Sequence, residues 1–124
     1  MAVTYTTAVK TARMTAVRDA IDGGPAAGYI EIGTAGMGTV LATIPLTDPC
    51  GTVSNGVLTF TMPHSDTSAD NTGTAAAARI RASNATDVVT GLTVGTSGAD
   101  INLDSVNITA GQTVTLTAGS ITHA

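Results

Sequence analysis

The residues whose types could support catalysis stand together in one polar stretch. His64, Ser65 and Asp66 are the three residue types of a hydrolase triad, and they are consecutive. Consecutive residues in an extended segment point in different directions, so these three cannot form the serine–histidine–aspartate relay with one another. The sequence also lacks a G-x-S-x-G nucleophile elbow. We therefore expect an ordinary polar loop here, no catalytic residues and no enzyme activity.

Oxygen-bearing side chains in and beyond the same stretch suit a hard cation. Asp66, Asp70 and Asn71 carry atoms that Ca²⁺ prefers, and Asp100 and Asp104 would join them if folding brought the loops together. Their spacing matches neither an EF-hand loop nor an RTX-type nonapeptide. The pattern favours Asx-turns and strand-end caps, and it predicts no metal site and no cofactor.

The remaining candidate residues are isolated from one another. Cys50 is the single cysteine, so it forms no internal disulfide, and no neighbouring base activates its thiol. His123 stands near the chain end, where we expect it only to finish a strand. Asn84 and Asn107 begin N-x-T sequons, but the N-terminus does not resemble a secretory signal. Tyr29 is the one plausible sugar-stacking ring in the β-rich part, and the lack of tryptophan argues against glycan binding but leaves it open.

One helix is predicted over residues 6–22, ahead of the β-rich part of the chain. Thr6 or Thr7 caps its N-terminus, and the run Gly23-Gly24-Pro25 ends it. Its apolar residues recur at helical spacing: Val9, Ala12, Ala16, Val17, Ala20 and Ile21. The basic residues are expected mostly on the opposite face, either solvated or docked onto an acidic partner.

After Gly28 the pattern alternates as β-strand. Strands are predicted over residues 29–32, 39–46, 57–62, 75–82 and 87–94, followed by a strand–turn–strand meander over residues 94–123. Pro45 suggests an edge or a strand end, and Gly91 marks an irregularity. Residues 47–55 are expected to form a loop, and Asn55-Gly56 is a strong turn dipeptide. The polar segment 63–74 is expected to be a surface loop.

In the meander, Gly111 and Gly119 are expected to bracket a final strand whose Val114 and Leu116 point inward. The pattern as a whole predicts a mainly β fold: an antiparallel β-sandwich or jelly roll with one N-terminal α-helix. We expect residues 1–28 to form an N-terminal helix and arm and residues 29–124 a β-sandwich domain, as a single domain overall.

Composition limits both the core and the partners. The 124 residues include 24 threonines but only three aromatic residues, Tyr5, Tyr29 and Phe60. Because large rings normally supply much buried area, we expect a modest core that gains from self-association. Residues 23–124 carry seven acidic side chains and two basic ones, so this part would repel phosphate and nucleic-acid binding is not expected. No stretch approaches the length of a membrane span.

Four stretches together resemble a known family. They are AVRDAIDGG, IGTAGMGTVLATIPLTDP, SDTSADNTGTAAAARI and VGTSGADINLDSVNITAGQTVTLTAGSITH, and they extend over nearly the whole chain. In them the sequence is similar to small virion structural proteins of tailed bacteriophages and prophages. Relatives place aromatic residues in the strand after TGTA, where this chain has only alanines, residues 76–78.

The resemblance implies a capsid decoration, or cement, protein that binds the assembled shell and stabilises it by inter-subunit contacts. Its partners would be the major capsid protein or other virion proteins, and it would be a homo-oligomer made in the bacterial host cytoplasm and located in the virion. The N-terminal segment would serve as a contact arm, and edge strands would pair between subunits or onto the shell. The alternative is a neck, tail or fibre component, including one that serves as a glycan-binding module.

Overall fold

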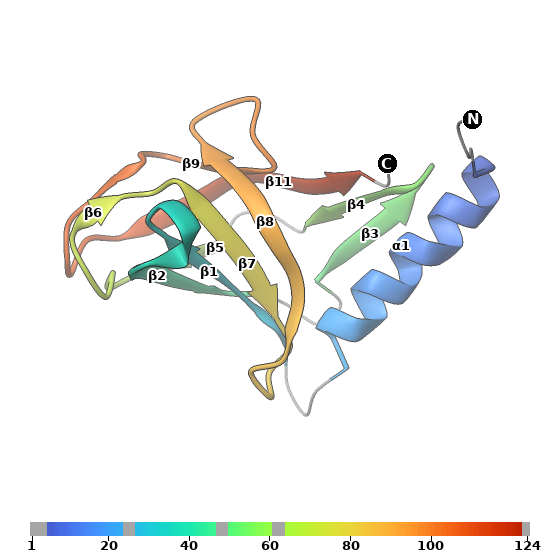
Figure 1. Ribbon diagram of the computed structural model, residues 1–124, viewed down its shortest axis with the longest axis horizontal. Helices are drawn as coiled ribbons and strands as arrows, with labels where there is room; N and C mark the ends of the chain where they lie inside the picture. The colour runs from blue at the N-terminus through green and yellow to red at the C-terminus, as the bar shows by residue number, and fades with distance from the viewer. Residues whose placement is uncertain (1–4, 24–26, 47–49, 61–63, 123–124) are drawn as a thin grey trace.

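The computed structural model describes residues 5–23, 27–46, 50–60 and 64–122. It is mainly β, with one helix, α1 (Thr7–Ile21), at the N-terminus and a 3-10 turn at Ala35–Met37 (Figure 1). The strands are β1 (Tyr29–Gly33), β2 (Val40–Pro45), β3 (Gly51–Ser54), β4 (Val57–Phe60), β5 (His64–Asp66), β6 (Gly73–Thr74), β7 (Ala77–Arg81), β8 (Asp87–Gly95), β9 (Ile101–Leu103), β10 (Asn107–Ile108) and β11 (Val114–Thr122). The predicted fold class, mainly β with an N-terminal helix, is confirmed.

The helix begins and ends close to where its capping residues predict. The hydroxyl of Thr6 accepts a hydrogen bond from the Val9 N–H at 3.3 Å, which satisfies a donor that the first turn leaves open. At the other end, the N–H groups of Asp22 and Gly23 donate to carbonyls of the last turn. Gly24 and Pro25 lie outside the described residues.

The strands form one large curled sheet. Its order is β2-β1-β7-β8-β9-β11-β4-β3, and β5 also pairs with β11. β4 and β5 run along the same side of β11, which places residues 57–60 beside the C-terminal half of β11 and residues 64–66 beside its N-terminal half. A separate two-stranded sheet joins β10 to β6.

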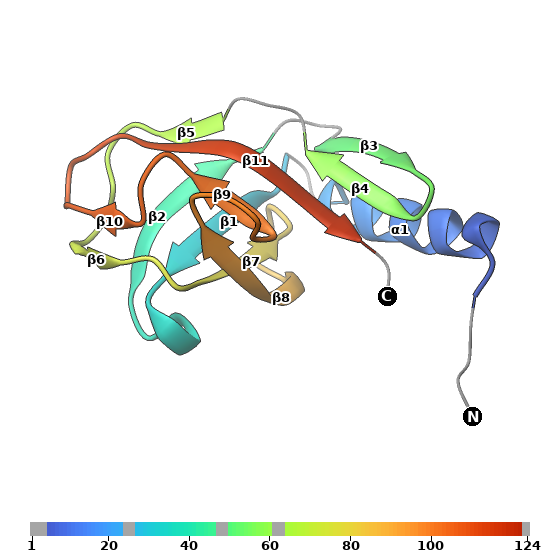
Figure 2. The same cartoon turned by 90° about the horizontal axis from the view of Figure 1, so that it is seen from above.

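Curling folds the β2 end of the sheet back toward β5 and β11. β2, at one end of the sheet, contacts β5 and β11 across the fold. Figure 2 shows β2 and β1 on one side, and β5 and β11 on the other, as two facing layers. The β3–β4 hairpin extends beyond them, and α1 packs over one face of that hairpin.

The core fills the space between these layers and under the helix. Alternation along the strands selects its members: Ile30 and Ile32 on β1 and Ile80 on β7 are fully buried, while Glu31 and Arg79 between them point outward. Of the three aromatic residues, only Phe60 belongs to the core. The buried set is Met14, Ile21, Ile30, Ile32, Leu41, Ala42, Ile44, Leu46, Cys50, Leu58, Phe60, Ala69, Ala75, Ala78, Ile80, Leu92, Ile101, Leu103, Ile108, Val114 and Leu116.

One predicted turn and one predicted irregularity are confirmed by backbone geometry. The loop expected over residues 47–55 is corrected, because residues 51–54 form β3 paired with β4. Asn55 and Gly56 both have positive φ, 51° and 75°, as a two-residue hairpin turn between β3 and β4 requires. Gly91, with φ of 73°, lies where the β7–β8 register shifts, so the predicted irregularity is a β-bulge.

The polar segment 63–74 is not entirely a loop, which corrects the sequence prediction. Its residues 64–66 form β5 against β11, and residues 73–74 form β6 against β10. The prediction missed both because a two- or three-residue strand shows almost no alternation, and the partner strands supply the hydrogen bonds that define it.

The closing meander also differs from its prediction. β9 runs parallel to β8, because residues 96–100 lead the chain back alongside β8 before β9 begins in the same direction as β8. Hydrogen bonds between Thr93 and Asp100 hold that loop closed, and Gly98 adopts a positive φ of 71° within it. Gly119, expected to end the final strand, instead lies buried inside β11, opposite Ile101.

The helix buries only part of the apolar set that its spacing predicts: Val17 and Ile21 pack on the core. Met14 and Ile21 are buried, and Val17 packs against the core, whereas four members of the predicted set are exposed. Those four are Val9, Ala12, Ala16 and Ala20. Two apolar faces compete in this helix, and the one with larger side chains buries more area against the hairpin. Within the described residues, no helix is long and apolar enough to cross a membrane.

Replacing Gly51 with alanine tests the close fit of the β3–β4 hairpin. A Cβ atom at Gly51 would overlap the backbone carbonyl of Thr59, which a paired strand cannot move aside. We expect Gly51→Ala to lower the free energy of unfolding by about 1–3 kcal/mol in denaturant titrations. The control is Gly38→Ala, because Gly38 has helical φ and ψ and only ordinary contacts. The control should be neutral or stabilising, by up to about 1 kcal/mol. Equal losses in both variants would contradict the prediction.

Candidate functional site

The polar segment that sequence reasoning singled out closes one edge of the sheet. The N–H of Asp70 donates to the carbonyl of Leu41 at 2.7 Å, and the side-chain amide of Asn71 donates to the carbonyl of Val40 at 2.8 Å. Both acceptors belong to β2, which is the last strand at its end of the sheet. We call the segment Asp66–Asn71 the edge cover, because it occupies backbone groups that β2 would otherwise leave unpaired.

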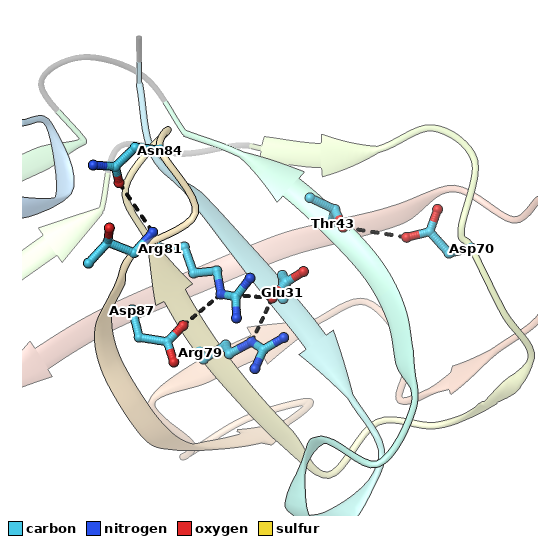
Figure 3. Close-up of polar contacts among 8 residues, drawn as sticks. Glu31, Thr43, Asp70, Arg79, Arg81, Asn84 and Asp87 are labelled. Carbon is cyan, nitrogen blue, oxygen red and sulfur yellow. Dashed lines mark hydrogen bonds and ion pairs between the residues drawn. The ribbon is translucent and has the colours of Figure 1, made fainter. Parts of the chain in front are cut away.

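Thr43 on β2 is the centre of this contact. Its backbone N–H donates to Asp66 Oδ2 at 3.0 Å, and its hydroxyl donates to Asp70 Oδ2 at 3.4 Å. Figure 3 shows the contact between Thr43 on β2 and Asp70, which lies in the segment between β5 and β6. The other oxygen of the Asp66 carboxylate accepts the N–H of Ser68 at 3.0 Å. Asp66 therefore fastens two backbone donors at once.

Adjacent residues of this segment do not combine into a hydrolase triad. Ser65 and Asp66 are adjacent in β5, so their side chains point to opposite faces of the sheet, and the Asp66 carboxylate is committed to Thr43 and Ser68. The Asp66 carboxylate accepts hydrogen bonds from backbone N–H groups, which is a structural role.

The acidic residues considered for calcium binding instead accept hydrogen bonds from the protein chain. Asp100 Oδ2 accepts the N–H and the hydroxyl of Thr93 at 3.0 and 3.1 Å, and Asp104 Oδ1 accepts the N–H groups of Ser105 and Thr115. Within the ranges that the structure describes, no three histidine, cysteine, aspartate or glutamate residues gather as a metal ion would need. Each carboxylate instead closes a turn or joins a loop to a strand.

The outer face of β1, β7 and β8 carries an ion-pair network that the sequence did not reveal. Glu31 Oε1 lies 2.6 Å from Arg79 Nε and 3.4 Å from Arg81 Nε, and Arg81 Nε lies 2.6 Å from Asp87 Oδ1 (Figure 3). Hydrogen bonds to Asp87 and then to Tyr29 raise the pKa of Arg81 above its ordinary value. The charges balance, so this face holds three strands together and attracts neither cations nor anions strongly.

A strand pattern could have placed this network outward but not assembled it. Arg79 and Arg81 are two residues apart on one strand and therefore share a face. Their meeting with Glu31 depends on the β1–β7 register, in which Glu31 lies opposite Arg79. Register is a tertiary property here, because the two strands are far apart in the chain.

The isolated candidate residues have structural surroundings. Cys50 is fully buried, and burial, followed by the negative charge of Asp22, raises the pKa of its thiol to about 12. Asn84 accepts the N–H of Thr86 at 3.2 Å in a turn. Tyr29 is half-buried beside Arg81 and is not a free ring platform. His123 lies outside the described residues.

Two shallow clefts are present on the described surface. One, of about 370 Å³, lies between the end of α1 and the β7–β8 turn, and the other, of about 260 Å³, lies over β4, β9 and β11. In the first, Asn84 already bonds Thr86 and Asp87 already pairs with Arg81. Small-molecule sites are usually concave with convergent polar groups, and in this cleft the side chains of Asn84 and Asp87 are committed to neighbours.

An apolar face of α1 is open to solvent. We call it the outer helix face, and it consists of Tyr5, Ala8, Val9, Ala12, Ala16 and Ala20. Tyr5 and Val9, 41% and 43% exposed, are the exposed large hydrophobic residues of the described chain. The sequence contained the signal, since the helix has apolar residues on two sides, but spacing alone did not tell which side faces the sheet.

The basic residues of the helix surround this face without forming a separate basic surface. The guanidinium of Arg13 stacks over the Tyr5 ring, 4.8 Å from its centroid, and Arg18 pairs with the neighbouring Asp19 at 3.3 Å. Lys10 lies half-buried with its side chain against Gly56.

Searches against protein-family models, curated proteins and solved structures found no match to this chain.

The two carboxylates at Thr43 allow a matched test of the edge cover. Asp66→Ala removes the acceptor of two backbone N–H groups and should lower the free energy of unfolding by about 1–2 kcal/mol. Asp70→Ala removes one long, exposed side-chain contact and should cost less than about 0.5 kcal/mol. Hydrogen exchange of the Thr43 amide should become faster in Asp66→Ala alone. Similar losses in both variants would show that Asp66 is not the fastening residue.

Cys50 should be unreactive in the folded protein. A thiol whose pKa is raised to about 12 is almost entirely protonated at pH 8, and the thiolate is the reactive form. Iodoacetamide at pH 8 should label the native chain about two to three orders of magnitude more slowly than the urea-unfolded chain, in which the thiol recovers its ordinary pKa. Comparable labelling rates would contradict the burial of Cys50.

Proposed function

We propose that this protein is a structural component of a tailed-bacteriophage virion, and that it decorates the capsid shell. The sequence resemblance to small virion proteins is the starting point for this proposal. The supporting observation is the outer helix face, an apolar surface on α1 that the described residues leave open to solvent at Val9 and the alanines. Apolar surface left in water on a small protein is typical of association with another macromolecule.

The uses of the polar side chains support an associative function over a chemical one. Asp66, Asp100 and Asp104 accept hydrogen bonds that hold strands and turns, and Cys50 is buried with a raised pKa. A residue that must accept or donate a proton in a reaction needs a substrate-facing atom. These four groups face their own backbone or the core instead.

Association through α1 would work by burial and mass action. Tyr5 and Val9 lose exposed apolar area on docking, at about 25 cal/mol for each Å² removed from water. The small side chains of Ala12 and Ala16 let a partner backbone approach the helix closely. A ligand that binds the assembled shell and not its separated subunits stabilises the shell by about 2.7 kcal/mol per site at a free concentration one hundred times its Kd.

A role in the neck, tail or fibre is the second candidate. It shares the same resemblance and the same associative chemistry, and it differs in stoichiometry and in position on the particle. Copy number distinguishes the two, because a shell offers many equivalent sites and a connector or fibre offers few.

The first test is the copy number of this protein in purified particles, by quantitative mass spectrometry against the major capsid protein. We expect a count comparable to that of the capsid protein. A count near that of a connector ring or fibre would move the assignment to the neck or tail. Absence from particles would overturn the virion proposal.

A variant on the outer helix face separates docking from folding. Val9→Glu places a carboxylate in the first turn of α1, which has no acidic residue, and the helix dipole should make this change neutral or stabilising by about 0.3–1 kcal/mol. The same charge should reduce particle occupancy at least about tenfold. The control, Ala110→Glu, adds an equal charge at an exposed turn. Full occupancy by Val9→Glu would exclude the outer helix face as the docking surface.

A further inference from the structure

The turn between β3 and β4 holds the residue pair of this chain that is most prone to spontaneous covalent change. Asn55 is the one asparagine in the sequence that is followed by glycine. The side-chain amide of an asparagine can react with the backbone nitrogen of the next residue. Glycine has no side chain to shield that nitrogen or to obstruct the ring that forms. The other asparagines precede residues with a side chain, which hinders the same attack.

This reaction, deamidation, needs only water as a co-reactant. The Gly56 nitrogen gives up its proton and bonds to the side-chain carbonyl carbon of Asn55, and the side-chain nitrogen takes up that proton and leaves as ammonia. Water then opens the resulting five-membered imide at one of its two carbonyl carbons. One opening gives aspartate, and the other gives isoaspartate, in which the backbone runs through the former side chain.

The structure leaves one of the two reacting groups free and holds the other. Asn55 is exposed, and no hydrogen bond from the described residues restrains its side chain. Gly56 is buried, and its N–H donates to the hydroxyl of Thr11 on α1 at 2.9 Å. A backbone N–H held in this way loses its proton slowly, because the hydrogen bond has to open first. The contact with Thr11 therefore protects the nitrogen that would react.

The helix also covers the turn sterically. A Cβ atom at Gly56 would lie 2.9 Å from the Cβ of Lys10, so the Lys10 side chain packs directly on this glycine. Figure 1 shows the β3–β4 hairpin beside α1, with the turn toward the N-terminal end of the helix. Asn55 and Gly56 both keep a positive φ in this position. Any motion that brings the Gly56 nitrogen to the Asn55 side chain has to displace the helix or the turn.

We propose that Asn55-Gly56 is a deamidation site of this protein, and that the docking of α1 on the hairpin sets the rate at which the site reacts. While the helix is docked, the Gly56 N–H stays bonded to Thr11 and the site is protected. When the helix leaves the hairpin, the nitrogen is free to lose its proton and the reaction proceeds. Loss of ammonia makes each event irreversible.

The two products affect the fold differently. Aspartate leaves the backbone unchanged and adds a carboxylate to a turn on which a lysine side chain packs. Isoaspartate adds a carbon atom to the backbone of a turn that joins the paired residues Ser54 and Val57 with only two residues. The longer backbone no longer fits that pairing. Isoaspartate therefore loosens the hairpin and with it the contact between Gly56 and Thr11.

The inference stands apart from the virion proposal, because it concerns the side of α1 that contacts the hairpin and not the outer helix face. Deamidation is measured on the isolated chain, whether or not the protein is found in particles. The two proposals therefore fail in different experiments.

The test compares two threonine-to-valine variants on α1. Thr11→Val keeps the branched shape of the side chain and removes the acceptor of the Gly56 N–H. Thr15→Val makes the same change one helical turn later, where the hydroxyl donates to the carbonyl of Thr11 within the helix. Both variants change helix propensity equally, so they differ in the contact with the turn.

Mass spectrometry of proteolytic peptides measures the conversion of Asn55 at mildly alkaline pH, with Asn55→Asp as the standard for the aspartate product. The wild-type chain unfolded in guanidinium chloride should deamidate at least about tenfold faster than the folded chain. Folded Thr11→Val should react at least about threefold faster than the wild type, and Thr15→Val should stay within about twofold of it.

Hydrogen exchange separates release of the helix from unfolding of the whole chain. In Thr11→Val, exchange of the Gly56 amide should accelerate together with deamidation, because both require the same N–H to be freed. The amides of β1 and β7 should keep their protection in the same sample.

Four results would overturn the inference. They are equal deamidation rates in the folded and unfolded wild type; equal acceleration by the two valine variants; faster reaction at another asparagine than at Asn55; and an acceleration in Thr11→Val that is matched by loss of protection in β1 and β7. The last result would assign the protection of the site to the fold as a whole and not to the docked helix.

Discussion

The requirement that strand edges find hydrogen-bond partners organises this fold. A long open sheet has two ends, and here curling brings β2 at one end close to β5. Pairing between the two strands is replaced by side chains and loop backbone, with Asp66, Asp70 and Asn71 reaching the groups of β2 directly. The most polar stretch of the sequence thus holds the β2 edge in place through hydrogen bonds. Its carboxylates and amides are there because a strand edge presents N–H and C=O groups that water would otherwise have to satisfy.

Small side chains set the second constraint. With a single aromatic residue in the core, the layers are held by isoleucine, leucine, valine and alanine at many positions. The alanines contribute little area wherever they lie, which is why α1 can leave Ala12, Ala16 and Ala20 in solvent at small cost and bury Met14 and Ile21 instead. A helix with two apolar faces and one sheet to pack on keeps one face available.

The surfaces that remain open are suited to association. The outer helix face offers Val9 and several alanine side chains, whereas the ion-pair network of Glu31, Arg79, Arg81 and Asp87 is balanced within itself.

Local sequence determined much of the fold because local rules govern it. Thr6 as the helix cap, Asn55-Gly56 as the turn, the bulge at Gly91, and the inward-facing Val114 and Leu116 all follow from capping, positive φ and two-residue alternation. Only the tertiary structure decided that Glu31 meets Arg79, that β9 runs parallel to β8, and that residues 64–66 become a strand. These features depend on the register and position of segments far apart in the chain, and no residue carries that information in its immediate neighbours. The face that α1 buries was decided in the same way, by which side the β3–β4 hairpin could cover.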